Sequence, residues 1–230
     1  MRLDKYIANT TDFSRKEVKS AIKQQLVEVN GLIAKDPGTH VNESDTVVIN
    51  GAHLNAPTPR YFMLNKPDGV VSANKDSNHP TVFDLLVDEA NRDKLHIAGR
   101  LDIDTTGLVL ITDDGQWTHR VISPNKACNK RYYVECEKPI DEKTVKFFER
   151  GIHLTGEKKR CKPAHIEILH PDSCLLTIQE GKFHQIKRMF LAMDNEVTYL
   201  HREAIGTIEL DESLEFGEYR ALTPTEISSI

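Results

Sequence analysis

The alternation of apolar and polar positions first describes a compact unit of small helices and short strands. Ser14 and Glu17 have the spacing of a capping box, which predicts a helix whose apolar positions recur every three or four residues. Short apolar runs follow, next to Asn-Gly dipeptides of the kind that turn a hairpin. The predicted elements are helices over 3–9 and 14–24 and strands over 27–29 and 47–49.

Strands dominate the remainder of the chain and do not alternate regularly with helices. This irregular order favours an α+β domain with a mixed, mainly antiparallel sheet over a doubly wound fold. Residues 52–60 carry two prolines and no periodicity, so we expect domains over 1–56 and 61–230, joined by a linker over 57–60. The predicted strands cover 61–64, 108–111, 132–134, 166–168 and 175–178, and the predicted helices cover 116–122, 141–150 and 184–193.

Composition places the chain among ordinary globular proteins, with 39% hydrophobic and 28% charged residues. No stretch approaches the roughly 20 apolar residues of a membrane span. The first residues lack the apolar core of a signal peptide, so we expect a cytoplasmic protein. The histidines and cysteines lack the spacing of a metal site, so we expect no metal and four reduced thiols. The cysteines are Cys128, Cys136, Cys161 and Cys174.

The net charge of −5 at first argues against a nucleic-acid-binding protein. The charge is unevenly distributed, however. Residues 203–230 contain seven acids and one base, so residues 1–202 carry a net +1. Residues 1–27 carry +3, and residues 117–134 contain four bases and no acid. Because RNA binding depends on a local positive patch, this pattern is compatible with it.

The densest group of chemically useful side chains lies at 99–108, directly before the predicted central strand. Asp102 and Asp104 stand there among threonines and glycines, in a loop where a core strand can hold reactive groups. The same composition also suits a turn whose aspartates cap backbone N–H groups. The pattern alone does not choose between Asp102 and Asp104.

Two further segments combine bases with aromatic or apolar residues. Residues 181–189 are basic and are predicted to begin an amphipathic helix. They are a candidate for a functional site, but the same pattern fits a helix whose basic face is simply solvated. Residues 130–133 place two bases beside Tyr132 and Tyr133, and aromatic rings beside bases suit stacking on unpaired nucleotides. Alternation along a strand would also bury one of these tyrosines and expose the other without any such role.

Four motifs, which follow one another in the same order as in the family, resemble those of the RsuA-type pseudouridine synthases. The first 55 or so residues, which open with Arg2-Leu3-Asp4-Lys5, resemble the S4 RNA-binding domain that precedes the catalytic domain in that family. The resemblance covers nearly the whole chain, and four ordered motifs are far more specific than a single short pattern. The motifs are Leu64-Asn65-Lys66-Pro67, Gly99-Arg100-Leu101-Asp102 with Thr105 and Gly107, Lys130-x-Tyr132, and Gly181-x-x-His184-Gln185-x-Lys187-Arg188-Met189.

The resemblance implies catalytic roles for Asp102, Tyr132 and Lys187. Asp102 would act on the sugar, either by attack at C1′ or by assisting elimination at C2′. Lys187 would be the nearby cation that keeps this carboxylate ionised in a dry pocket. Tyr132 would stack on the target base, which must leave the RNA helix to reach the site.

The resemblance also implies RNA contacts. Arg100 resembles the residue that some relatives insert into the space left by the target base. Because the reaction is an isomerisation, no cofactor is expected. The expected partner is small-subunit ribosomal RNA, free or in a partly assembled particle, bound by a monomer with no membrane and no metal. The expected RNA-binding residues are Arg100, Arg188, Arg2, Arg15, Lys16 and Lys19.

The target and the class of function have alternatives. Residues 184–188 and 102–117 resemble the small-subunit members of the family, which implies uridine 516 of 16S rRNA as the target. The same chemistry on large-subunit 23S rRNA is the first alternative. A non-catalytic S4-domain protein of ribosome assembly is the second. A glycosidase or nucleosidase that uses Asp104 as a second carboxylate is the third.

Overall fold

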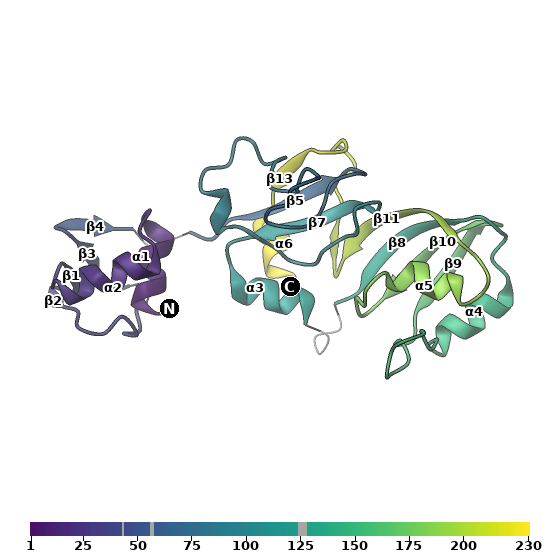
Figure 1. The fold of residues 1–230 in the computed structure, drawn as a ribbon, viewed down its shortest axis with the longest axis horizontal. Coiled ribbons are helices and arrows are strands. Elements are labelled where there is room, and N and C mark those ends of the chain that lie inside the picture. Colours follow the sequence, from purple (N-terminus) through teal and green to yellow (C-terminus); the bar gives the residue numbers. More distant parts are fainter. Residues whose placement is uncertain (43, 56–57, 124–127) are drawn as a thin grey trace. The chain divides into compact units, whose positions relative to one another are not determined.

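The computed structural model describes residues 1–42, 44–55, 58–123 and 128–230. The chain divides into two compact units, 1–59 and 60–230, whose elements are labelled in Figure 1. Ala56 at the end of the expected first domain, Pro57 of the expected linker and Lys126 of the basic run lie outside the described residues. No described helix has the length and apolar character needed to cross a membrane.

The first unit packs two helices on a four-stranded antiparallel sheet. Its elements are α1 (Leu3–Thr10), α2 (Arg15–Lys23), β1 (Val27–Val29), β2 (Leu32–Ile33), β3 (Val47–Ile49) and β4 (Ala52–Leu54), with strand order β2-β1-β3-β4. The predicted capping box is confirmed. Ser14 Oγ accepts a hydrogen bond from the Glu17 N–H (3.3 Å), and the Glu17 carboxylate accepts one from the Ser14 N–H (2.7 Å). The apolar stripe of α2 is buried, so its bases are exposed to solvent.

The second unit is built on one long sheet of order β13-β5-β7-β11-β8-β10-β9. Neighbouring strands pair antiparallel along this order, except that β7 and β11 are parallel. This confirms the predicted α+β fold with a mixed, mainly antiparallel sheet. The elements are β5 (Tyr61–Lys66), β6 (His96–Ile97), β7 (Thr106–Thr112), α3 (Gly115–Ile122), β8 (Lys130–Cys136), α4 (Glu142–Glu149), β9 (His165–His170), β10 (Ser173–Ile178), α5 (Gln185–Leu191), β11 (Val197–Ile205), β12 (Ile208–Glu209), β13 (Tyr219–Ala221) and α6 (Pro224–Ser228).

Each face of this sheet carries its own apolar core, because successive side chains of a strand point to opposite faces. In β7, Leu108 and Leu110 pack with Trp117 of α3 on one face. Val109 and Ile111 belong to the core on the other face, to which α4 and α5 contribute. β7 is therefore buried over its whole length, as its continuous apolar run predicts.

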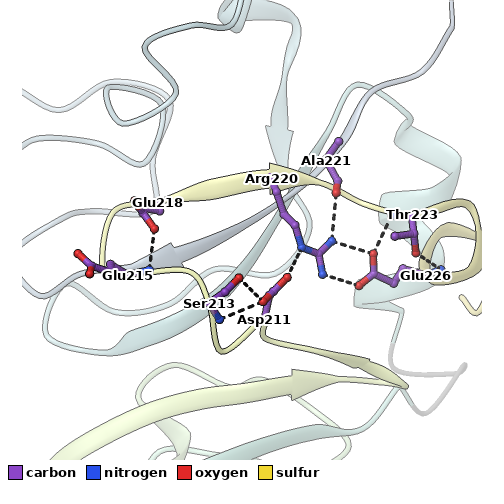
Figure 2. A network of polar contacts seen from close by, with 8 residues as sticks. All are labelled: Asp211, Ser213, Glu215, Glu218, Arg220, Ala221, Thr223 and Glu226. Carbon is purple, nitrogen blue, oxygen red and sulfur yellow. Dashed lines mark hydrogen bonds and ion pairs between the residues drawn. The ribbon is translucent and has the colours of Figure 1, made fainter.

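Residues 203–230, described above only as acidic, are integral to the second unit. β13 pairs with β5, and the Trp117 indole N–H donates to the Ile227 carbonyl (2.9 Å). Figure 2 shows Arg220 between two carboxylates, at 2.6 Å from Asp211 and 2.9 Å from Glu226. Hydrogen bonds from Ser213 and Arg220 lower the pKa of Asp211 to about 2, and those from Arg220 lower the pKa of Glu226 to about 2. These acids therefore hold the end of the chain together.

The parallel pairing of β7 with β11 requires a residue without a side chain at Gly107. Gly107 lies opposite Arg202 and has φ +99°, a conformation that L-residues with side chains rarely adopt. A Cβ at this position would lie 2.4 Å from the Arg202 carbonyl oxygen and 2.7 Å from its nitrogen. Both atoms belong to the backbone, so neither can move away cheaply.

We expect Gly107→Ala to destabilise the protein by about 2 kcal/mol or more, because it adds backbone strain and separates β7 from β11. Thermal or denaturant unfolding measures the change. The matched control is Gly115→Ala, at the first position of α3, where a Cβ would meet nothing within 4 Å and φ is not positive. This control should be neutral or slightly stabilising. Equal stabilities of the two variants would contradict the close approach.

Candidate functional site

A buried arginine on β11 holds the loop in which the two candidate aspartates lie. The Arg202 side chain belongs to a residue that is only 1% exposed. Its Nε donates to the Leu108 carbonyl (2.8 Å), its Nη2 to the Gly99 carbonyl (2.8 Å) and its Nη1 to the Arg100 carbonyl (3.3 Å). The guanidinium therefore fixes the backbone at the start of the 99–105 loop relative to β7.

Arg202 is not among the residues predicted from the sequence. It lies outside the four motifs, in a strand that was not predicted. A signal was present: residues 197–205 alternate along a strand, but the inward position 202 carries a charge. A charged residue at such a position interrupts the apolar pattern by which a half-buried strand is normally identified.

A second buried cation supports the same loop from β5. Lys66 is 0% exposed, and its Nζ donates to the carbonyls of Pro67 (2.7 Å) and Ile103 (3.0 Å). Burial lowers the pKa of Lys66 to about 8, against the opposing attraction of Asp68, Asp104 and Asp102. Lys66, which belongs to the first motif, thus places its ammonium group directly behind the peptide that separates the two candidate aspartates.

Asp102 and Asp104 flank this peptide and have different partners. Asp102 Oδ1 lies 3.7 Å from His184 Nε2, and 32% of the Asp102 side chain is exposed. Asp104 Oδ1 accepts a hydrogen bond from Lys187 Nζ at 2.5 Å. Burial alone would raise the pKa of Asp104, but the hydrogen bond and charge of Lys187 hold it below its ordinary value. Both carboxylates are open to solvent on one side.

The expected pairing of Lys187 with Asp102 is therefore not the one that the structure shows. His184 caps α5 in the left-handed conformation (φ +46°) and brings its own imidazole towards Asp102. Lys187, almost one helical turn later, reaches the next carboxylate in the turn. Both aspartates lie within reach of the fourth motif, and motif order carries no information about which one a given side chain meets.

Tyr132 lies on the same face of the sheet as the loop and joins it through Arg202. Its hydroxyl accepts a hydrogen bond from Arg202 Nη1 (3.3 Å), and Arg202 Cζ lies 5.9 Å from the centre of its ring. Only 7% of Tyr132 is exposed. Its neighbour Tyr133 points to the other face and donates to Glu135 (2.9 Å). Strand alternation thus selects Tyr132 as the tyrosine of the site.

The remaining expected residues have varied surroundings. Arg100 is exposed and precedes Asp102 by two residues in the chain. Arg188 is bound within the second unit, to the Thr155 carbonyl (2.7 Å) and to Glu157 (3.2 Å). Arg2 forms an ion pair with Asp4 (2.9 Å) in the first unit. The structure thus assembles the catalytic candidates into one site of the second unit, while the expected RNA-binding bases of α2, Arg15, Lys16 and Lys19, are exposed on the first unit.

This arrangement suits a carboxylate that acts on an electron-poor carbon. Asp102 is accessible, stands beside an imidazole and has two buried cations behind its loop. A carboxylate in its ionised form can attack a sugar carbon or stabilise a cationic sugar. The loop itself is held by hydrogen bonds from both of these cations, so the carboxylate is positioned before any substrate binds.

Comparison with known proteins identifies two families. The RNA pseudouridylate synthase family matches residues 60–192, and the S4 domain family matches residues 1–47. Over its full length the chain is 48% identical to the ribosomal small subunit pseudouridine synthase A of Vibrio cholerae, of which it covers 99%. It is 49% and 48% identical to the proteins of that name from Salmonella typhimurium and Escherichia coli K12, and covers 100% of each. A crystal structure of a pseudouridylate synthase, 46% identical, matches with a TM-score of 0.72 and covers 100% of this chain and 99% of that one.

The low pKa of Lys66 predicts a specific pH dependence of stability. The value of about 8 in the folded protein lies below the ordinary 10.5, so between these pH values the unfolded chain binds more protons. The free energy of unfolding should therefore rise with pH in this window, by about 3 kcal/mol relative to a Lys66→Met variant. Urea unfolding of both proteins from pH 7 to pH 10.5 measures the difference. Parallel curves would show that Lys66 is not desolvated in the folded state.

Proposed function

The chain belongs to the RNA pseudouridylate synthase family, and on this premise we propose that it isomerises one uridine of small-subunit ribosomal RNA to pseudouridine. The observation that carries the proposal is the identity of 47–49% over the whole chain to relatives named for that reaction on the small subunit. The geometry supports it, because Asp102, Tyr132 and their two supporting cations form one site. We propose uridine 516 of 16S rRNA as the target.

The reaction keeps every atom of the uridine. The N1–C1′ bond breaks, the uracil turns over while it is held, a C5–C1′ bond forms, and the proton on C5 is lost as N1 gains one. The carbon that changes partner is C1′ of the ribose, which becomes electron-poor when the base departs. A carboxylate placed near C1′ can attack it or stabilise its charge, as the carboxylates of glycosidases do.

We assign this role to Asp102. Its carboxylate is accessible, and its ion-pair partner, the His184 imidazole, lies 3.7 Å away, too far for a hydrogen bond. Asp104 is less suited, since its carboxylate is bound by Lys187. Lys187 then acts by holding Asp104 and the turn, and by adding positive charge to the site. The Tyr132 ring supports the base as it turns over, with its hydroxyl oriented by Arg202.

The S4 unit supplies affinity for the RNA in this proposal. The outward face of α2 displays Arg15, Lys16 and Lys19, which are exposed and form no ion pair among the described residues. Such a face contacts phosphates regardless of sequence and brings the RNA to a separate catalytic unit. Arg100, exposed and two residues before Asp102 in the chain, would fill the space left by the extruded uridine. We propose that the enzyme acts on this RNA in the cytoplasm and works as a monomer.

We expect Asp102→Asn to reduce pseudouridine formation by about three orders of magnitude or more, because the amide cannot attack C1′ or stabilise its charge. The matched control is Asp104→Asn, which removes the same charge from the same loop and should cost less than tenfold. Single-turnover conversion of a small-subunit rRNA fragment that contains the target, read by chemical probing, gives both rates. Substantial turnover by Asp102→Asn and little by Asp104→Asn would reverse the assignment.

We expect the triple replacement of Arg15, Lys16 and Lys19 by alanine to weaken RNA binding most strongly at low salt. Each phosphate contact contributes roughly 0.7 to 0.9 to the slope of log K against log salt, so the slope should flatten by about two units. Exchanging Glu212 and Glu215 for glutamine alters exposed acids of residues 203–230 and should leave the slope nearly unchanged. Titration of the rRNA fragment at several salt concentrations measures these slopes. An unaltered slope for the triple variant would remove the docking role from the S4 unit.

A further inference from the structure

The loop between α4 and β9 carries three consecutive exposed bases, Lys158, Lys159 and Arg160. Within the part of the chain that the structure describes, none of these side chains forms an ion pair. The one acid of the loop, Glu157, lies 3.2 Å from Arg188 and 3.7 Å from Lys182, so its charge is compensated from another segment. The loop therefore presents positive charge that is not used inside the protein.

This loop has a defined shape. The Cys161 N–H donates to the Ile152 carbonyl (2.8 Å) and closes the loop at its base. Cys161 and Leu154 are buried, at 4% and 1% exposed, which anchors both arms in the core. Gly151 allows the two arms of the loop to approach each other, because a Cβ at this position would overlap sterically with the Cys161 carbonyl oxygen. The backbone that carries the three basic residues is thus fixed before any partner binds, which lowers the entropic cost of binding.

The loop is bound to the segment that begins α5, beside which it lies in Figure 1. Arg188 Nη2 donates to the Thr155 carbonyl (2.7 Å), and Lys182 Nζ donates to the Lys159 carbonyl (3.0 Å). Arg188 Nη1 also donates to the Phe183 carbonyl (3.0 Å), so one guanidinium fixes both the basic loop and Phe183. Arg188 was expected to contact RNA. In the structure it positions the residues around it.

Phe183 connects this loop to the catalytic carboxylate. Its side chain is an exposed large apolar group, with 74% of the residue accessible. The ring stacks on His184, with the ring centres 3.8 Å apart and the planes 19° from parallel. His184 in turn lies 3.7 Å from Asp102. An exposed, oriented aromatic face thus stands between the basic loop and the reacting group.

We propose that Phe183 and the bases Lys158, Lys159 and Arg160 form a second RNA-binding surface, which holds the nucleotides next to the target uridine. An unpaired nucleobase stacks on Phe183, and the basic side chains of the loop contact the phosphates that follow. Exposed aromatic rings combined with cations are the means by which proteins bind unpaired nucleotides. A nucleotide here would be adjacent to the one at Asp102. The inference rests on the proposed function and identifies how its substrate is held within the catalytic unit.

Two sets of variants test the surface through binding of the rRNA fragment that contains the target. Replacing Lys158, Lys159 and Arg160 by alanine should flatten the slope of log K against log salt by about two units, as three contacts to single-stranded phosphates require. The control replaces Lys75, Lys143 and Lys146, three exposed bases elsewhere in the second unit, and removes the same net charge. It should change the slope little.

Phe183→Ala should weaken binding about tenfold with little change in the salt slope, because stacking is not ionic. Phe183→Tyr keeps the ring and should restore most of the affinity. In single-turnover assays, the Phe183→Ala and basic-loop variants should both convert the target more slowly. The main change should be a higher RNA concentration for half-maximal conversion, because the variants bind RNA more weakly. If the wild-type protein converts the target and these variants behave like the control, the proposal that this surface binds RNA is contradicted. The surface would then be tested for binding of a protein partner. If the wild-type protein converts no uridine while the variants still weaken RNA binding, the proposed function fails and the surface stands.

Discussion

A buried guanidinium that must be fully hydrogen-bonded is the constraint on which the site depends. Removing a charge from water is tolerated only where its N–H groups find acceptors. Arg202 finds the carbonyls of Gly99, Arg100 and Leu108 and the hydroxyl of Tyr132. These acceptors come from the 99–105 loop, β7 and β8, so satisfying one side chain determines the relative positions of three segments. Gly107 permits this arrangement, because only a residue without a side chain lets β7 approach the backbone of β11 so closely.

The site combines this rigid support with accessible chemistry. Lys66 and Arg202 lie behind the loop, almost completely removed from solvent, while Asp102 and Asp104 remain open in front of it. Positive charge in a region of low dielectric acts on the carboxylates more strongly than the same charge would in water. The cations also donate to backbone carbonyls of the loop, so the groups that supply this charge are the ones that position the carboxylates.

The negative total charge is consistent with an RNA substrate because many acids are paired within the protein. Arg220 binds Asp211 and Glu226, and Arg131 lies 3.0 Å from both Glu203 and Glu209. The bases on α2 and on the α4–β9 loop face solvent. The charge that RNA would meet is therefore set by which side chains are exposed and unpaired, and a total over the sequence does not report this.

Local rules were sufficient for the features that depend on near neighbours in the chain. Ser14 and Glu17 predicted the start of α2, the Asn-Gly dipeptide at 30–31 the turn between β1 and β2, and the apolar run of β7 its burial on both faces. The motifs, through a family resemblance, indicated Asp102. Only the tertiary structure showed that β11 brings Arg202 to the loop and that Lys187 meets Asp104. These contacts join segments about 80 to 100 residues apart. Periodicity and capping act over a few residues, whereas the pairing of distant charges follows from how the strands are ordered in the sheet.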